Sequence, residues 1–198
     1  SGLVEFEKFD TARMIVGEFV LEFAGARSEK YPQDSRKPSV APVKTLEEDL
    51  RRRDFTVNAI ALDIGAAEWS AGGTWSEEGA GPKSYGSFID PFHGQDDIKR
   101  KILRTPLEPR ITFSEDPLRM IRAARFAAQL GFTIEPSALD AIEKNTERLK
   151  IVSEERIKEE MDKLLCAPLP SIGLWVLYNT GLLDYILPEL TALYGVEF

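Results

Sequence analysis

The stretch SEDPLRMIRAAR, residues 114–125, spaces three arginines at intervals of three residues along a predicted helix. Because an α-helix advances about 100° per residue, Arg119, Arg122 and Arg125 fall on one face. The apolar residues between them fall on the opposite face, which predicts a helix with one side in a core. Asp116 precedes Arg119 by one turn, close enough to pair with it.

Two interpretations of this stripe stay open. Charged helix faces are usually only solvated, and Ser114 would then be the N-cap while Glu115 and Asp116 complement the helix dipole. In the second interpretation, a carboxylate beside guanidinium groups reads a nucleotide base. In either case we expect one helix that opens at Ser114 and ends at Gly131, a typical C-terminal glycine.

The composition is that of a globular protein of 198 residues and 22.2 kDa, with 43% hydrophobic and 29% charged residues. No apolar run approaches the roughly 18 residues of a membrane span, so we expect a cytoplasmic protein with no membrane contact. The single cysteine excludes an internal disulfide. The net charge of −8 argues against a broadly electropositive nucleic-acid surface, so any such contact is local.

The first half of the chain mixes strand and helix signals. Residues 11–24 predict a hairpin that turns at Gly17, and its return strand carries Glu22, which is either solvated or aimed at a ligand. Residues 28–43 are polar and contain three prolines, which predicts a long loop. The capping-box pattern at 45–48 predicts a short helix through Arg53, and residues 66–87 are interpreted as an insertion.

After about residue 90 the patterns are helical. Further helices are expected from Pro136, after an N-cap at Ser153, and over residues 171–179. Asp96 and Asp97 are expected to cap a helix. The sequence therefore predicts an α+β protein, with a mixed part at residues 1–90 and a helical part at residues 91–198.

Three segments resemble one family, the class II tRNA nucleotidyltransferases and bacterial poly(A) polymerases. Residues 46–59, LEEDLRRRDFTVNA, resemble its motif DLxRRDFTxNA, residues 115–119 resemble EDxxR, and residues 153–160 resemble an element that buttresses the same site. The resemblance covers nearly the whole chain, although His93 replaces a glycine common in the family. It implies a partial nucleotidyltransferase head, of DNA polymerase β-like fold with a small sheet, at 1–90. A helical neck that binds nucleotide and RNA would follow at 91–198.

By this resemblance, Arg53 and Asp54 hold the ribose and phosphates of a nucleotide, with Arg52 nearby. The alternative for these arginines is a cationic helix end that complements the dipole. Asn58 belongs to the same motif, and it either fixes the backbone around Asp54 or touches the ligand.

The resemblance also makes Asp116 and Arg119 the base-reading pair. Cytosine and adenine present an amine donor beside a ring-nitrogen acceptor, whereas a carboxylate accepts and a guanidinium donates. We therefore expect Asp116 to take the amine and Arg119 the ring nitrogen. Arg122 and Arg125 would support the site or the triphosphate.

The reaction implied by the resemblance is phosphoryl transfer assisted by two Mg²⁺ ions. Family members hold these ions with a D-x-D pair on a strand that would precede residue 1, so no metal ligand is assigned here. Glu22 matches the place of a third catalytic carboxylate. We therefore expect this chain alone to incorporate no nucleotide.

The leading function from the sequence is the addition of C and A to the 3′ end of tRNA, with CTP, ATP and RNA as partners. Poly(A) polymerase is the near alternative, because it shares these motifs. A noncatalytic RNA-binding protein with a degenerate nucleotidyltransferase fold is the alternative from another class.

Overall fold

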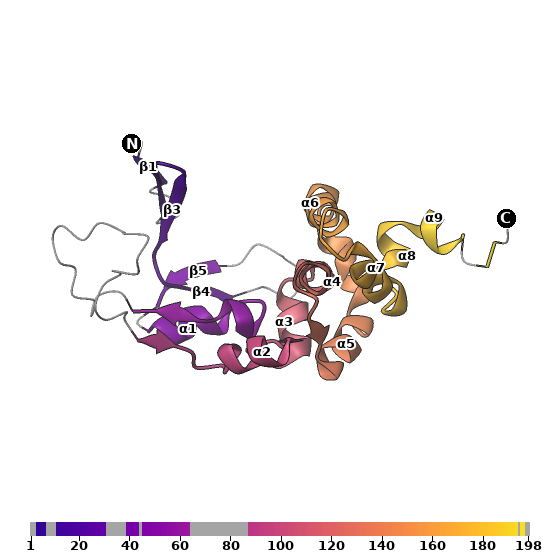
Figure 1. The fold of residues 1–198 in the computed structure, drawn as a ribbon, viewed down its shortest axis with the longest axis horizontal. Helices are drawn as coiled ribbons and strands as arrows, with labels where there is room; N and C mark the ends of the chain where they lie inside the picture. The colour runs from indigo at the N-terminus through magenta and orange to yellow at the C-terminus, as the bar shows by residue number, and fades with distance from the viewer. Residues whose placement is uncertain are drawn as a thin grey trace, which may run out of the picture.

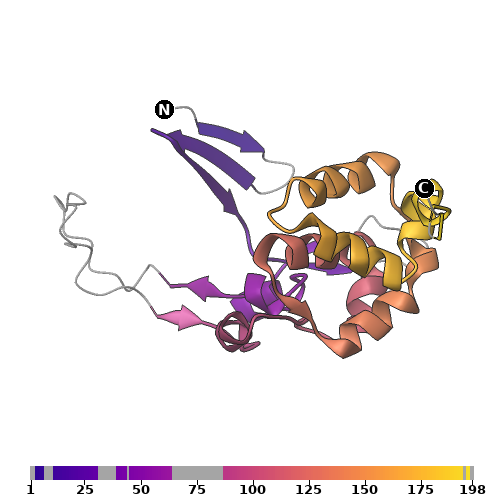
Figure 2. The same cartoon turned by 45° about the vertical axis from the view of Figure 1, so that its right-hand side comes forward.

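The computed structural model describes residues 3–6, 11–30, 39–43, 45–63, 87–193 and 195–196 (Figures 1 and 2). Its strands are β1 Leu3–Phe6, β2 Thr11–Val16, β3 Phe19–Ala24, β4 Arg27–Lys30, β5 Ser39–Pro42, β6 Ala61–Leu62, β7 Phe88–Ile89, β8 Ile102–Leu103 and β9 Thr133–Ile134. Its helices are α1 Leu46–Arg51, η2 Thr56–Asn58, α2 Gly94–Arg100, α3 Pro109–Glu115, α4 Leu118–Leu130, α5 Pro136–Glu143, η3 Thr146–Ile151, α6 Glu154–Leu165, α7 Pro170–Asn179, α8 Leu183–Ile186 and α9 Pro188–Thr191. Within these ranges, no helix combines the length and apolar character needed to cross a bilayer.

The predicted hairpin is confirmed. Strands β2 and β3 pair antiparallel on either side of a turn at Gly17, whose φ is +60°, and β1 adds a third strand. Figure 1 shows this sheet as an arm that stands apart from the helices. Its apolar side chains, such as Phe19 at 74%, are largely exposed.

The expectation of a loop over residues 28–43 is wrong where the structure describes it. Strand β4 pairs antiparallel with β5, with Arg27 opposite Pro42. Strand β4 is polar and both strands have only four residues, so they carry little of the alternating apolar pattern that identifies a half-buried strand. Pro42 is tolerated because β5 is an edge strand of a two-stranded sheet. Residues 31–38 lie outside the described part of the chain, as does the predicted insertion apart from Ser87.

The N-cap of the predicted capping box is confirmed at the start of α1. Thr45 is the N-cap, and its hydroxyl accepts a hydrogen bond from the Glu48 amide at 3.4 Å. The helix ends at Arg51, two residues before the predicted end. The chain then passes through Asp54 and Phe55 into the single turn η2.

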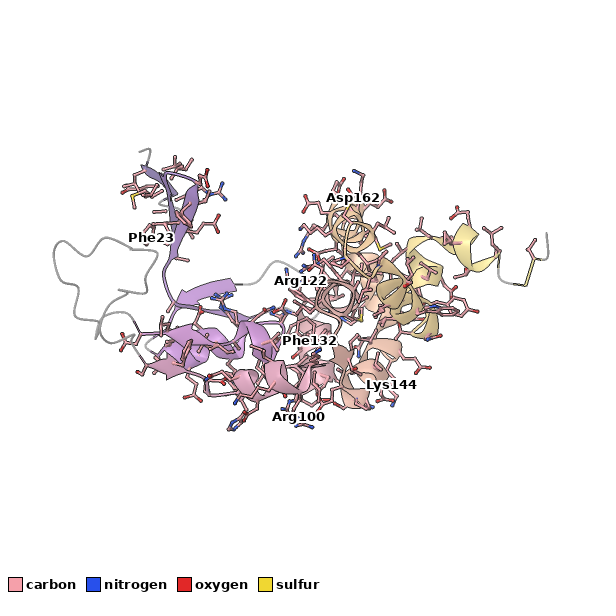
Figure 3. The ribbon with its side chains drawn as sticks, in the orientation of Figure 1. Phe23, Arg100, Arg122, Phe132, Lys144 and Asp162 are labelled. Atoms are coloured by element: carbon pink, nitrogen blue, oxygen red, sulfur yellow. The ribbon has the colours of Figure 1, made fainter. Side chains whose placement is uncertain are left out.

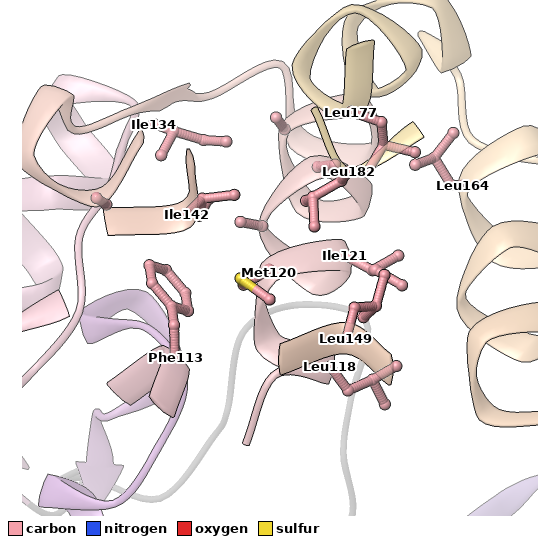
Figure 4. Packing of buried hydrophobic residues seen from close by; sticks show 14 of the residues in the cluster. Phe113, Leu118, Met120, Ile121, Ile134, Ile142, Leu149, Leu164, Leu177 and Leu182 are labelled. Atoms are coloured by element: carbon pink, nitrogen blue, oxygen red, sulfur yellow. The ribbon is translucent and has the colours of Figure 1, made fainter. Parts of the chain in front are cut away.

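The core of the second part surrounds α4. Met120 and Ile121 are fully buried, and α6 and α7 pack against α4. Figure 4 shows Met120 pointing toward Phe113 and Ile142. Gly173 allows the close approach of α7, because a Cβ atom at this position would lie 2.8 Å from the carbonyl oxygen of Ala124.

The predicted single helix from Ser114 is wrong, because the chain breaks between α3 and α4. Asp116 has an extended backbone, with φ −131° and ψ 98°, and Ser114 belongs to the end of α3. Proline disfavours helical geometry in the residue before it, so Pro117 forces this break. The predicted C-terminus is confirmed, since Gly131 ends α4 with φ +65°. The helices expected near Pro136, Ser153 and residues 171–179 are present as α5, α6 and α7.

The expected capping role of Asp97 is also wrong. Asp90 caps α2 instead, accepting hydrogen bonds from the Gly94 and Gln95 amides at 2.7 and 2.9 Å. Asp97 is fully buried and accepts from the Thr56 hydroxyl at 2.7 Å and from Arg104 Nε at 3.0 Å. The hydrogen bond to Asp97 raises the pKa of the Arg104 guanidinium.

His93 precedes α2 in a left-handed conformation with φ +59°, which explains why a glycine suits this position. The mixed strands and helices confirm the α+β expectation, with the short parallel pair β8–β9 inside the helical part. The boundary at residue 90 stays a prediction.

Candidate nucleotide-binding site

A hollow of about 340 Å³ lies where the end of α1, the segment before η2 and the start of α4 meet. It is lined by Arg52, Arg53, Asp54, Asn58, Asp116, Arg119 and Arg122. Six of these residues were assigned to a nucleotide site from the sequence, although they come from segments some sixty residues apart. Four arginines against two aspartates give the hollow a net positive charge, which suits an anionic ligand.

Asp54 is a buried carboxylate in the lining of the hollow that pairs with several neighbouring groups. Its side chain is 7% exposed, and Oδ1 accepts hydrogen bonds from the Phe55 amide at 2.9 Å and from Asn58 Nδ2 at 3.0 Å. Oδ2 pairs with Arg122, with Nε at 2.8 Å and Nη2 at 2.5 Å. Phe55 is fully buried against Phe126 of α4, with ring centroids 5.7 Å apart in an edge-to-face contact. The two motifs are therefore joined by packing and by an ion pair.

Asp49 holds the two neighbouring arginines. Its side chain is 6% exposed; Oδ1 accepts from Arg52 Nη2 at 2.7 Å, and Oδ2 accepts from Arg53 Nη2 at 2.9 Å. Arg53 is the more exposed of the pair at 46%, against 19% for Arg52. Asp49 of α1 thus orients both arginines, and their assignment to a bound nucleotide stays a prediction.

Arg119 bridges the two motif segments. Its Nη2 donates to the carbonyl oxygen of Arg52 at 2.6 Å, and its Nη1 donates to that of Thr112 at 3.4 Å. Glu115 lies 3.8 Å from Nη1. A guanidinium carries more N–H donors than these two hydrogen bonds use, so donors remain for a ligand.

The predicted pairing of Asp116 with Arg119 is wrong for this state of the molecule. Asp116 Oδ2 lies 3.5 Å from Nη2 of Arg156 on α6, and Oδ1 accepts from the Leu118 amide at 3.2 Å. The break at Pro117 explains the difference, because the i, i+3 geometry of a continuous helix does not apply across it. Both Asp116 and Arg119 nevertheless line the hollow.

Arg125 does not line the hollow. It lies one turn further along α4, where Nε pairs with Glu160 of α6 at 2.5 Å and Nη1 donates to Gln129 at 2.7 Å. Its guanidinium also stacks over Phe126 at 3.9 Å from the ring centroid. Arg119 and Arg125 are only 7% and 8% exposed, so the interpretation as a solvated stripe is wrong for these two residues.

Glu22 lies on the arm and not at the hollow. It faces Arg13 on the neighbouring strand, whose Nε donates to it at 3.1 Å, and both side chains are more than half exposed. Figure 3 shows the adjacent residue Phe23 on the arm and Arg122 near the middle of the molecule, away from the arm. In the described ranges no three His, Cys, Asp or Glu residues are grouped as they would be to hold a metal ion. The described residues therefore do not fit a Mg²⁺ site.

Sequence reasoning did not assign Asp49 to the site, and it placed Arg156 and Glu160 only within the segment 153–160 that is expected to buttress the site. Asp49 and Glu160 are charged residues at buried helix positions, a pattern that indicates a buried ionic partner. The sequence could have raised this question, but it could not name the partner, because Glu160 and Arg125 lie thirty-five residues apart.

Comparison with known proteins identifies the fold as the head and neck of a nucleotidyltransferase. Residues 2–104, over half of the chain, match the family described as "Poly A polymerase head domain". Residues 131–194 match the family described as "Probable RNA and SrmB-binding site of polymerase A". The chain therefore belongs to the class II CCA-adding enzyme and poly(A) polymerase family.

Individual relatives agree with this family. The chain is 43% identical over 155 residues to the CCA-adding enzyme of Geobacillus stearothermophilus, which covers 78% of this chain and 33% of that protein. It is 37% identical over 183 residues to the CCA-adding enzyme of Streptococcus pneumoniae, covering 92% of this chain and 41% of that protein. The chain thus spans about a third to two-fifths of these relatives.

Solved structures show the same arrangement of elements. The crystal structure of the Bacillus stearothermophilus CCA-adding enzyme with CTP aligns with a TM-score of 0.72 and 36% identity, over 92% of this chain and 39% of that one. A tRNA nucleotidyltransferase complexed with a primer tRNA and an incoming ATP analog aligns with a TM-score of 0.72 and 28% identity. That alignment covers all of this chain and 48% of the other.

Proposed function

We propose that this chain supplies the nucleotide-selecting part of a template-independent RNA nucleotidyltransferase, which adds C and A to the 3′ end of tRNA from CTP and ATP. One observation carries the proposal. Asp116, which only accepts hydrogen bonds, and Arg119, which only donates them, both line one hollow of net positive charge.

The base is selected by hydrogen-bond polarity. Cytosine and adenine offer an amine beside a ring-nitrogen acceptor, and these groups match Asp116 and Arg119 respectively. Uracil and guanine offer a carbonyl beside an N–H, so acceptor would face acceptor and donor would face donor. A buried polar group left unpaired costs about 1–3 kcal/mol, so two such mismatches are sufficient for strong discrimination.

The other arginines suit the rest of the nucleotide. Arg53 and Arg52, held by Asp49, bind the phosphates, and Asp54 accepts a hydrogen bond from a ribose hydroxyl. Arg122 keeps Asp54 in place through their ion pair. Arg125 supports the site indirectly, because its ion pair with Glu160 fixes α4 against α6.

Phosphoryl transfer in the complete protein would need Mg²⁺, and we assign that ion no ligand among the described residues. The role of Glu22 as a third catalytic carboxylate stays a prediction. The solved relatives named with CTP, with an ATP analog and with primer tRNA support the proposed substrates for this chain. Poly(A) addition is the second candidate, favoured by the descriptions of the two matching families.

Single-nucleotide addition assays test the proposal. The complete gene product that carries this chain is incubated with tRNA lacking its terminal CCA, with Mg²⁺ and with each nucleoside triphosphate separately. We expect addition of C, followed by A when both nucleotides are supplied. Long A tails without C would support poly(A) polymerase, and no addition of any nucleotide would support a noncatalytic protein. The isolated 198-residue chain is expected to add nothing.

The variant Arg119→Met tests the base-reading role. It keeps an unbranched, though shorter, side chain and removes the N–H donors of the guanidinium. A hydrogen bond to a charged group contributes about 1.5–3 kcal/mol, so kcat/KM for CTP and ATP should fall by about 10- to 100-fold. Unchanged kinetics with both nucleotides would refute the assignment.

A further inference from the structure

We propose that Asp97 is a positioning residue that holds the turn of residues 54–58 in place, and that it thereby contributes to the preference for ribonucleotides over deoxyribonucleotides. This inference rests on the proposed function, in which Asp54 accepts a hydrogen bond from a ribose hydroxyl. It extends the site to α2, which carries Asp97, and to Arg104, which follows β8. Neither Asp97 nor Arg104 lines the hollow.

Three residues close a ring of hydrogen bonds next to this turn. The Thr56 hydroxyl donates to Asp97 Oδ2 at 2.7 Å, and the Thr56 amide donates to the carbonyl oxygen of Arg104 at 2.8 Å. Arg104 closes the ring, since its Nε donates to the same Asp97 oxygen at 3.0 Å and its Nη2 pairs with Oδ1. Thr56 is thus held through its side chain and its backbone by two distant segments of the chain.

The ring is buried, and its charges are matched. Thr56 and Asp97 are 2% and 0% exposed, so water does not compete for the hydrogen bond between them. A buried carboxylate is unfavourable unless a cation compensates it, and Arg104 supplies that cation. Because a charged acceptor makes a stronger hydrogen bond than a neutral one, Asp97 holds the Thr56 hydroxyl more firmly than an uncharged side chain would.

The elements that carry the ring are themselves fixed. Gly94 at the start of α2 lies directly against the turn, because a Cβ atom at this position would be 2.2 Å from the Thr56 carbonyl oxygen. Leu103, which precedes Arg104, is fully buried in the core, and its carbonyl oxygen accepts from the Glu135 amide at 3.0 Å. The ring therefore ties the turn both to α2 and to the core.

This turn sets the position of the Asp54 carboxylate. Asp54 accepts from the Phe55 amide and from Asn58 Nδ2, which lie on either side of Thr56 in the chain. Without the hydrogen bond of the Thr56 hydroxyl, the turn is free to shift, and the Asp54 carboxylate shifts with it. CTP then loses part of the hydrogen bond from its 2′-hydroxyl, whereas dCTP has no such bond to lose. The ratio of CTP to dCTP use should therefore fall.

The test is Thr56→Val in the complete gene product, with kcat/KM for CTP and for dCTP measured in single-nucleotide addition to tRNA. Valine keeps the branched shape and removes the hydroxyl, and it leaves the pair of Asp97 with Arg104 intact. We expect the CTP to dCTP ratio to fall by about five- to tenfold, mostly through the KM for CTP. Thr56→Ser, which keeps the hydroxyl, should retain most of the ratio. The CTP to UTP ratio should stay near that of the wild type, because base reading is assigned to Asp116 and Arg119.

Thr180→Val is the matched control on α7. Thr180 is 6% exposed, and its hydroxyl also donates a 2.7 Å hydrogen bond, in this case to the carbonyl oxygen of Val176. The substitution removes a buried hydroxyl at a position that does not line the hollow. Its CTP to dCTP ratio should equal that of the wild type.

The outcomes separate the inference from the function on which it rests. A Thr56→Val protein with the wild-type CTP to dCTP ratio overturns the inference, and so does one in which CTP and dCTP use fall equally, since that shows a general structural role. Should Thr56→Val fail to fold, Asp97→Asn supplies the same comparison, because its single oxygen cannot replace both carboxylate oxygens in the ring. A wild-type protein that uses CTP and dCTP equally would instead overturn the ribose contact of Asp54 in the proposed function.

Discussion

Replacing Glu160 by methionine tests the ion pair that fixes α4 against α6. Glu160 and Arg125 are 4% and 8% exposed, and their contact is 2.5 Å. Removing one partner of a buried pair leaves an uncompensated charge, which costs about 3–5 kcal/mol. Arg125 keeps its hydrogen bond to Gln129 and its stacking on Phe126, so we expect the lower end of this range, about 3 kcal/mol.

The assay is urea unfolding of the chain, followed by far-UV circular dichroism. The double variant Arg125→Met, Glu160→Met should cost less than Glu160→Met alone, because it leaves no buried charge without a partner. Asp162→Asn is the matched control on α6, since Asp162 is 62% exposed and its surface pair contributes under about 1 kcal/mol. A loss below about 1 kcal/mol for Glu160→Met, or additive losses in the double variant, would refute this reasoning.

Three further predictions concern the fold. Phe55→Ala should destabilise the chain by about 3–5 kcal/mol in urea unfolding, because Phe55 is fully buried, and a loss under about 1 kcal/mol would contradict this. Gly173→Ala should lower stability by about 1–3 kcal/mol, since its Cβ would lie 2.8 Å from the Ala124 carbonyl oxygen; an unchanged melting temperature would show that α7 does not pack this closely. The hydrogen bond from Lys144 lowers the pKa of Asp140, so the contribution of this carboxylate is present above the unfolded pKa and is lost as the pH falls through the folded pKa. The stability difference between wild type and Asp140→Asn should therefore shrink in acid, and a difference that grows in acid would contradict it.

Much of the fold could be predicted because local signals agreed with the final structure. The capping box at Thr45, the hairpin turn at Gly17 and the C-terminal glycine Gly131 each act within a few residues. The break at Asp116 also has a local signal, because Pro117 follows it. The regular spacing of the arginines nevertheless favoured one continuous helix in the prediction. Strands β4 and β5 are only four residues long, so their sequences are too short to show a clear alternating pattern.

The candidate site was predictable as a set of residues but not as a set of contacts. The two motifs placed Arg52, Asp54 and Arg119 in one site, and the structure brings them to one hollow. The partners could not be predicted in the same way. The pairing of Asp116 with Arg156 joins residues forty positions apart, and only the packing of α6 on α4 determines it.

A structure of the complete gene product with bound CTP tests the central claim most directly. The account predicts the cytosine amine within about 3 Å of the Asp116 carboxylate and the ring nitrogen within about 3 Å of the Arg119 guanidinium. A cytosine that lies away from both side chains, with the phosphates still in the hollow, would contradict it.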